Sequence, residues 1–196
     1  MRRMAASLAF LVLAAPSAAA STDDAARSCF PLAQGNRWTF DDSRTGAGST
    51  MRATRVRPGV FRLDGFPGAS ALRVRWAGGV LQAWDAGQRR WEGFLRLAAR
   101  KGTTYRVDLP HPLWRDVRVS VSSRSAVVRV EPLKRSFSKA VRLTLEPSPG
   151  LSDAGITGMV FAPGVGLVRW EELTFTGPVA HALSSARVNG RKIGRR

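Results

Sequence analysis

Residues 72–84 read Leu72-Arg73-Val74-Arg75-Trp76-Ala77-Gly78-Gly79-Val80-Leu81-Gln82-Ala83-Trp84, and this stretch decides the fold class. In its first five residues apolar side chains alternate with arginine, which is the period of a β-strand that buries one face. Gly78-Gly79 is a two-residue turn signal, so the residues after it are the return strand of a hairpin. The stretch therefore predicts antiparallel β-structure.

The same alternation recurs in short runs from Trp38 onward, with turn residues between them, at 61–63, 105–109, 117–121 and 141–145. Residues 91–101 fit either a short helix or a strand, and no other part of the mature chain has a helical period. We therefore expect an all-β domain built as a single curved antiparallel sheet or half-open barrel, with the periplasmic lipoprotein carriers as the nearest analogue. A closed barrel or a β-sandwich is the alternative.

The first twenty residues have the three parts of a secretory signal peptide. Arg2 and Arg3 supply the charge, residues 5–15 are apolar, and Ala18-Ala19-Ala20 provides the small residues of a cleavage site. The apolar run is shorter than the roughly 20 residues that span a bilayer. We expect a Sec signal with cleavage after Ala20, a periplasmic or secreted protein, and no transmembrane segment after cleavage.

The rest of the chain is expected to be one domain. We assign residues 21–29 to a flexible N-terminus, 30–188 to a single β domain and 189–196 to a basic tail. Cys29 is the only cysteine, so no internal disulfide can form. The residues before it include Arg27, which does not fit a lipobox, and lipidation at Cys29 is therefore not expected. Nothing in the sequence indicates an oligomer, and we expect a monomer.

Positive charge dominates the composition. The chain has 31 lysines and arginines against 14 acidic residues, a formal net charge of +17. Period-two alternation places arginine on the solvent side of strand after strand. We list as candidate anion-binding residues Arg73, Arg75, Arg106, Arg118 and Arg142. The charge suggests an anionic lipid, lipopolysaccharide or another polyanion as partner, without specific nucleic-acid binding. A GC-rich genome that favours arginine codons is the alternative reading.

The tryptophans form the second candidate set. The chain has six, and several follow an arginine directly. Because neighbours on a strand point to opposite faces, such a tryptophan fills the core by default. The alternative is an apolar cleft with arginines at its rim. Its candidate ligand-binding residues are Trp38, Trp76, Trp84 and Trp91.

The sequence lacks the patterns of a catalytic or metal site. His111 and His181 have no metal-ligand spacing with each other or with Cys29. The acidic pairs, such as Glu171-Glu172, point to opposite faces of a strand. No nucleophile elbow, phosphate loop or dinucleotide fingerprint is present. We expect no enzyme, no cofactor and no metal.

Two motifs resemble those of a large group of exported bacterial proteins of unknown function. Residues 30–40 (FPLAQGNRWTF) are similar to the opening F-P-L-x-x-G-N-x-W-x-Y of that group, and residues 161–169 (FAPGVGLVR) to its signature F-A-P-G-V-G-L-V-[KR]. Between them, Pro132 and Phe137 match the V-P-A-G-T-F segment, with 133–136 replacing its centre. The resemblance implies an exported β-rich protein and carries over no catalytic residue. Both motifs also serve as turns that lead into strands.

Three functional hypotheses follow. The first is a non-enzymatic cell-envelope protein that binds an amphipathic or anionic ligand in the hollow of its sheet. The second is an interaction or scaffold protein whose arginine face binds a polyanion. The third, the weakest, is a hydrolase that uses Asp or Glu.

Overall fold

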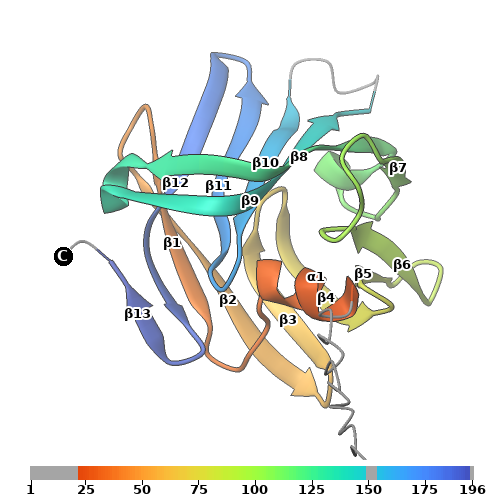
Figure 1. Ribbon diagram of the computed structural model, residues 1–196. Coiled ribbons are helices and arrows are strands. Elements are labelled where there is room, and N and C mark those ends of the chain that lie inside the picture. Colours follow the sequence, from red (N-terminus) through yellow and green to blue (C-terminus); the bar gives the residue numbers. More distant parts are fainter. Residues whose placement is uncertain (1–21, 149–153, 195–196) are drawn as a thin grey trace, which may run out of the picture.

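The computed structural model describes residues 22–148 and 154–194 (Figure 1). The expected signal peptide at 1–20 lies outside the described residues. The strands are β1 (Arg37–Asp42), β2 (Gly48–Arg57), β3 (Val60–Phe66), β4 (Ala69–Ala77), β5 (Val80–Asp85), β6 (Arg90–Leu95), β7 (Thr104–Val107), β8 (Val117–Val130), β9 (Arg135–Glu146), β10 (Gly155–Ala162), β11 (Gly166–Thr174), β12 (Gly177–Val188) and β13 (Arg191–Ile193). The helical elements are α1 (Thr22–Cys29), η1 (Pro112–Trp114) and η2 (Glu131–Leu133).

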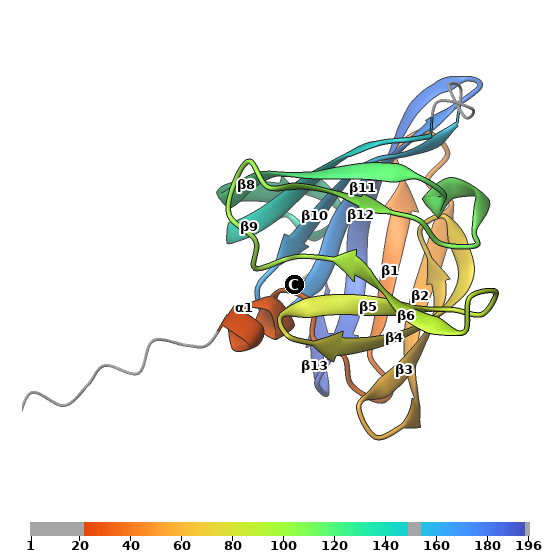
Figure 2. The ribbon, with the colours of Figure 1, turned by 90° about the vertical axis from the view of Figure 1, so that its right-hand side faces the viewer.

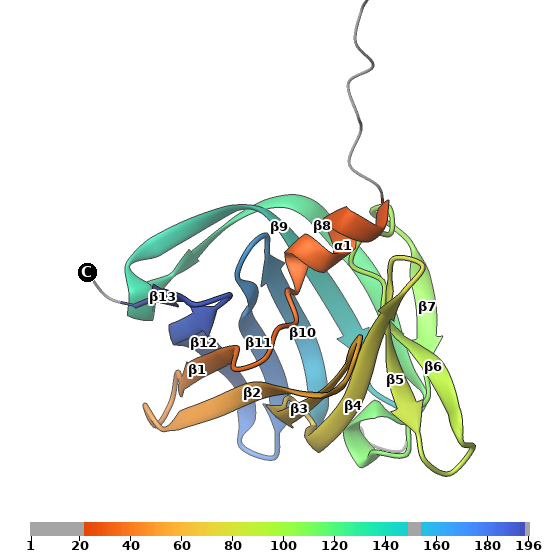
Figure 3. The same ribbon diagram turned by 90° about the horizontal axis from the view of Figure 1, so that it is seen from below.

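All these strands belong to one antiparallel sheet. Its order is β6-β5-β4-β3-β2-β1-β12-β11-β10-β9-β8-β7, with β13 added beside β12. The sheet curls until its two end strands, β6 and β7, approach each other (Figure 3). There the backbone N–H of Arg96 donates to the Tyr105 hydroxyl at 3.1 Å. The structure is thus a nearly closed, barrel-like antiparallel sheet, and the expected fold class is confirmed.

The hairpin that decided the fold class forms as predicted. Ala77 pairs with Val80 across Gly78-Gly79, whose φ angles are +56° and +74°. Positive φ at both central residues is the conformation of a type I′ turn, which glycine adopts without steric cost. The ambiguous stretch 91–101 begins as a strand, since β6 runs to Leu95.

The interior of the barrel is filled by side chains. Inward residues of both halves of the sheet form one hydrophobic cluster, in which Phe30, Trp38, Phe94 and Trp114 are fully buried. Phe30 is not on a strand, yet its ring contacts those of Trp38 and Phe161, with centroid distances of 5.4 Å and 5.6 Å. Core side chains therefore fill the interior of the sheet around Phe30 and Trp38.

Residues 21–29 were expected to be flexible, and here the structure differs. Thr22–Cys29 form α1, which lies between the β8–β9 and β4–β5 hairpins (Figure 2). The Asp23 carboxylate accepts hydrogen bonds from Arg27 one turn later and from the backbone N–H of Gly79, both at 2.8 Å. Acids in the first turn also suit the helix dipole. Eight residues are too few to form a stable helix alone, so packing against distant strands stabilises α1.

The expected basic tail also forms structure. Arg191–Ile193 are strand β13, which pairs with the end of β12 after a turn at Asn189-Gly190. Both segments were predicted from local sequence alone. In the structure α1 is held by contacts with distant strands, and β13 is held by pairing with β12 across a turn.

The reactivity of the Cys29 thiol tests the packing of α1. Its side chain is buried, and this burial raises the pKa of the thiol. Because the thiolate is the reactive form, a disulfide reagent at pH 8 should label native protein more than about tenfold more slowly than unfolded protein. Absorbance of the released thiol measures both rates on this single cysteine. Equal rates would mean that α1 does not pack as described.

Candidate functional site: a row of cations on the outer sheet

The four candidate tryptophans do not line one cleft. Trp38 is fully buried and donates its indole N–H to the Val165 carbonyl at 2.7 Å. Trp76 is half-buried against the core, with its indole N–H 3.3 Å from the Phe30 carbonyl. The expectation that Trp38 lines a cleft is wrong, because its position on β1 faces the core.

Trp84 and Trp91 lie elsewhere, on the outer face of the sheet. They are directly opposite each other on β5 and β6 and half-buried. Arg73 and Arg75 of β4 share this face, and the Arg75 guanidinium lies 4.4 Å from the centre of the Trp91 ring. The structure therefore brings together two candidates from each expected set.

The other three candidate arginines lie on β7, β8 and β9. Arg106 and Arg118 are opposite each other on β7 and β8, and each has an acidic partner. Arg106 is bonded to Asp116 at 2.5 Å, and Arg118 lies 3.4 Å from Glu146. Arg142 of β9 is exposed and opposite Val160 of β10, which separates it from Arg169 of β11. These side chains do not converge on one site.

A row of four basic side chains crosses neighbouring strands at the other side of the barrel. Arg52 of β2 is opposite Arg37 of β1, Arg37 is opposite Arg187 of β12, and Arg187 is opposite Lys192 of β13. All four are exposed on the outer face. We call Arg52, Arg37, Arg187 and Lys192 the cation row. At about 4.8 Å per strand it extends over roughly 14 Å.

No acid neutralises the cation row among residues 22–148 and 154–194. None of its four side chains has an ion pair there. Asp64 of β3 is directly opposite Arg52, but its carboxylate forms an ion pair with Arg62 at 2.6 Å. Like charges directly opposite on a sheet repel each other, so the row costs stability unless an anion binds.

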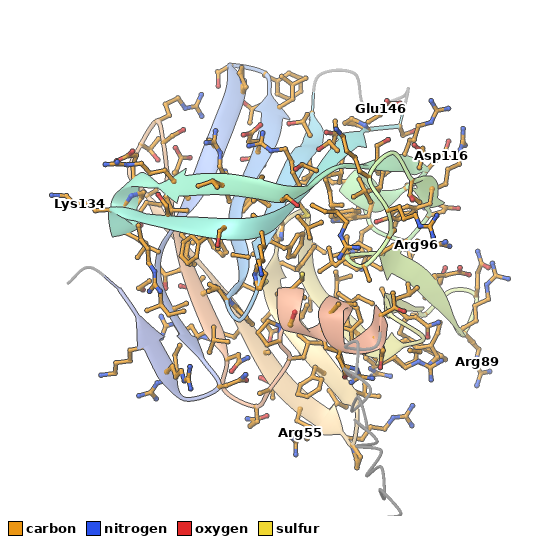
Figure 4. The ribbon with its side chains drawn as sticks, in the orientation of Figure 1. Arg55, Arg89, Arg96, Asp116, Lys134 and Glu146 are labelled. Carbon is orange, nitrogen blue, oxygen red and sulfur yellow. The ribbon has the colours of Figure 1, made fainter. Side chains whose placement is uncertain are left out.

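The row borders a hollow of about 630 Å³. Its lining includes Arg37, Arg187 and Lys192 from the row, and Arg135 from the tip of the β8–β9 hairpin. The hydroxyl-bearing Thr39 and Ser185 also line it, and none of its lining residues is acidic. Figure 4 places neighbouring Lys134 at this hairpin tip, with Asp116 and Glu146 on the opposite side of the molecule. The hollow offers cations and hydrogen-bond donors, which suits an anion.

The two histidines lie in different surroundings. His111 precedes η1 in a loop, as expected. His181 stacks on Trp170 inside the barrel, with ring centres 3.6 Å apart, and its Nε2 lies 3.0 Å from Glu172. Glu171 points the other way, to Arg169 at 2.9 Å. In the described part of the chain, no three His, Cys, Asp or Glu side chains are placed to hold a metal ion.

The described helices include none with the length and apolar character needed to cross a bilayer.

Comparisons with known proteins identify no family. No protein-family model matches the chain, and no curated protein matches it. Two solved structures are similar. One is a protein from Bacteroides fragilis described as exported and with a YmcC-like fold (14% identity, TM-score 0.42), and the other a lipoprotein from Parabacteroides distasonis (10% identity, TM-score 0.38). Each alignment covers 79% of this chain and 96% of the other. Such distant likenesses assign no function to the chain.

Proposed function

We propose that the protein is an exported, non-enzymatic protein of the cell envelope that binds a polyanion on the outer face of its barrel. The cation row carries this proposal. Its four basic side chains are exposed, directly opposite one another and without acidic partners in the described residues. Export is inferred from the signal-like residues 1–20 and from the two motifs at 30–40 and 161–169.

A chain of anions suits the row better than a single small ion. One phosphate or carboxylate is too small to reach side chains at both ends of roughly 14 Å. A linear polymer with repeated negative charges contacts all four, and each contact releases condensed counterions. The adjoining hollow adds Arg135 and two hydroxyl groups.

Salt-titrated binding tests this proposal. Fluorescence anisotropy of labelled linear polyphosphate should show binding to wild-type protein at 50 mM NaCl. The logarithm of the affinity should fall against the logarithm of salt with a slope of roughly −3, or about −0.7 for each of four contacts. An affinity that ignores salt, or no binding at 50 mM NaCl, would count against the proposal.

A further inference from the structure

The second feature of the outer face is a pair of tryptophans, Trp84 and Trp91, that lie outside the hydrophobic core cluster. The ring centres of Trp84 and Trp91 are 5.4 Å apart, and their planes meet at 64°. Both indoles keep part of their surface in solvent. A partly exposed indole combines a large apolar surface with an N–H donor, so it can contact a ligand that has both apolar and polar groups.

Arg75 holds one side of this pair in place. Its guanidinium covers the Trp91 ring, and its Nε donates to Gln82 at 2.8 Å. Gly93, opposite Gln82, has no side chain to obstruct this arrangement. The contacts fix Trp91 before any ligand arrives, which lowers the entropic cost of binding.

The pair forms one wall of a pocket of about 360 Å³. The other lining residues are Val56, Arg57 and Arg73. Neither arginine has an ion pair among the residues the structure describes. The pocket thus combines two aromatic rings with two unneutralised guanidinium groups, and it contains no carboxylate.

The pocket and the cation row lie on the same face of the sheet. Arg73, in the pocket, is opposite Arg62 of β3. Two residues further along β3, Asp64 is opposite Arg52, the first member of the row. One extended polymer can therefore contact both without passing around an edge.

We propose that the Trp84–Trp91 pocket binds an acidic pyranose ring of an anionic polysaccharide that runs along the cation row. This rests on the proposed function and names the class of polyanion. Two rings that meet at 64° form a corner, so a flat ring cannot be sandwiched between them. A puckered sugar ring fits the corner by placing apolar C–H groups against both indoles, while Arg57 and Arg73 bind its charged substituent.

Three probes and one variant test this inference. The probes are a labelled polygalacturonate oligomer, linear polyphosphate of matched charge, and single-stranded oligo-dT, and the variant is Trp84→Ala. Wild-type protein should bind the polyuronate more tightly than the polyphosphate. Trp84→Ala should weaken polyuronate binding roughly 5- to 150-fold, if the ring contact contributes as much as the stacking of a base on an aromatic side chain. It should leave polyphosphate binding unchanged, which also shows that the variant is folded.

Each other outcome overturns the inference in a distinct way. If Trp84→Ala weakens oligo-dT as much as polyuronate, the pocket stacks flat rings and does not select sugars. If Trp84→Ala weakens the binding of neither polyuronate nor oligo-dT, or weakens all three probes alike, the pocket recognises no ring. If polyphosphate binds wild-type protein and polyuronate binds no tighter, the cation row stands and the sugar assignment fails. If polyphosphate does not bind wild-type protein at 50 mM NaCl, the proposed function fails as well.

Discussion

Replacing Arg37 and Arg187 together by glutamine is expected to weaken polyphosphate binding about 100-fold at 50 mM NaCl. These two residues are the centre of the cation row, and each has a cation on both sides. A charge-assisted contact contributes about 1.5 kcal/mol or more, close to tenfold in affinity. Losing two contacts should also reduce the salt slope by about 1.4. Anisotropy titrations at several salt concentrations measure both effects.

A matched control separates the row from general positive charge. Arg106→Gln with Arg118→Gln removes the same two charges from directly opposed arginines on β7 and β8. Those arginines are already paired with Asp116 and Glu146, so this variant should lose less than about threefold in affinity. Equal losses in the two variants would show that net charge, and not the row, binds the polyanion.

Stability provides an independent check on the same variants. Because opposed like charges repel, Arg37→Gln with Arg187→Gln should unfold at equal or slightly higher urea concentration than wild type at low salt. Weaker binding with unchanged stability excludes misfolding as the cause.

Phe30→Ala is expected to lower the free energy of unfolding by about 3–5 kcal/mol. The side chain is fully buried and contacts the rings of Trp38, Phe66 and Phe161. A Cβ on Gly166 would come within 3.0 Å of the Phe30 ring, which shows how closely the site is packed. Urea unfolding followed by tryptophan fluorescence measures the loss.

Phe175→Ala is the control for this change. Phe175 is 89% exposed at the β11–β12 turn, so its removal should alter the unfolding free energy by less than about 0.5 kcal/mol. A loss below about 1 kcal/mol for Phe30→Ala would contradict the position of Phe30 in the core.

The alternation of apolar and polar residues, together with the turn residues, was sufficient to predict the sheet. The alternation around Arg73 and Arg75 gave the buried and exposed faces of β4 correctly, and the Gly78-Gly79 turn fixed its pairing with β5. The same alternation separates Glu171 from Glu172, which point outward and inward. Such features depend on neighbours within a few residues, and a single sequence contains that information.

The cation row depends on register between distant strands, and the sequence does not contain that directly. Arg37 and Arg187 are 150 positions apart, and each looks like an ordinary solvent-facing residue of its own strand. Lys192 was assigned to a basic tail, although it extends the row on β13. The sequence does show arginine at the solvent-facing positions of many strands. This pattern predicts that the outer face of the sheet is basic, but it does not predict where on that face the cations line up.

Residue-specific NMR of wild-type protein tests the central claim most directly, because it needs no variant. The side-chain Nε–Hε signals of arginine are followed while short linear polyphosphate is added at 50 mM NaCl. The structure predicts large, saturable shifts for Arg37, Arg52 and Arg187, and little change for Arg106 and Arg118. Shifts of similar size across all arginines, or shifts confined to β7 and β8, would contradict a binding site at the cation row.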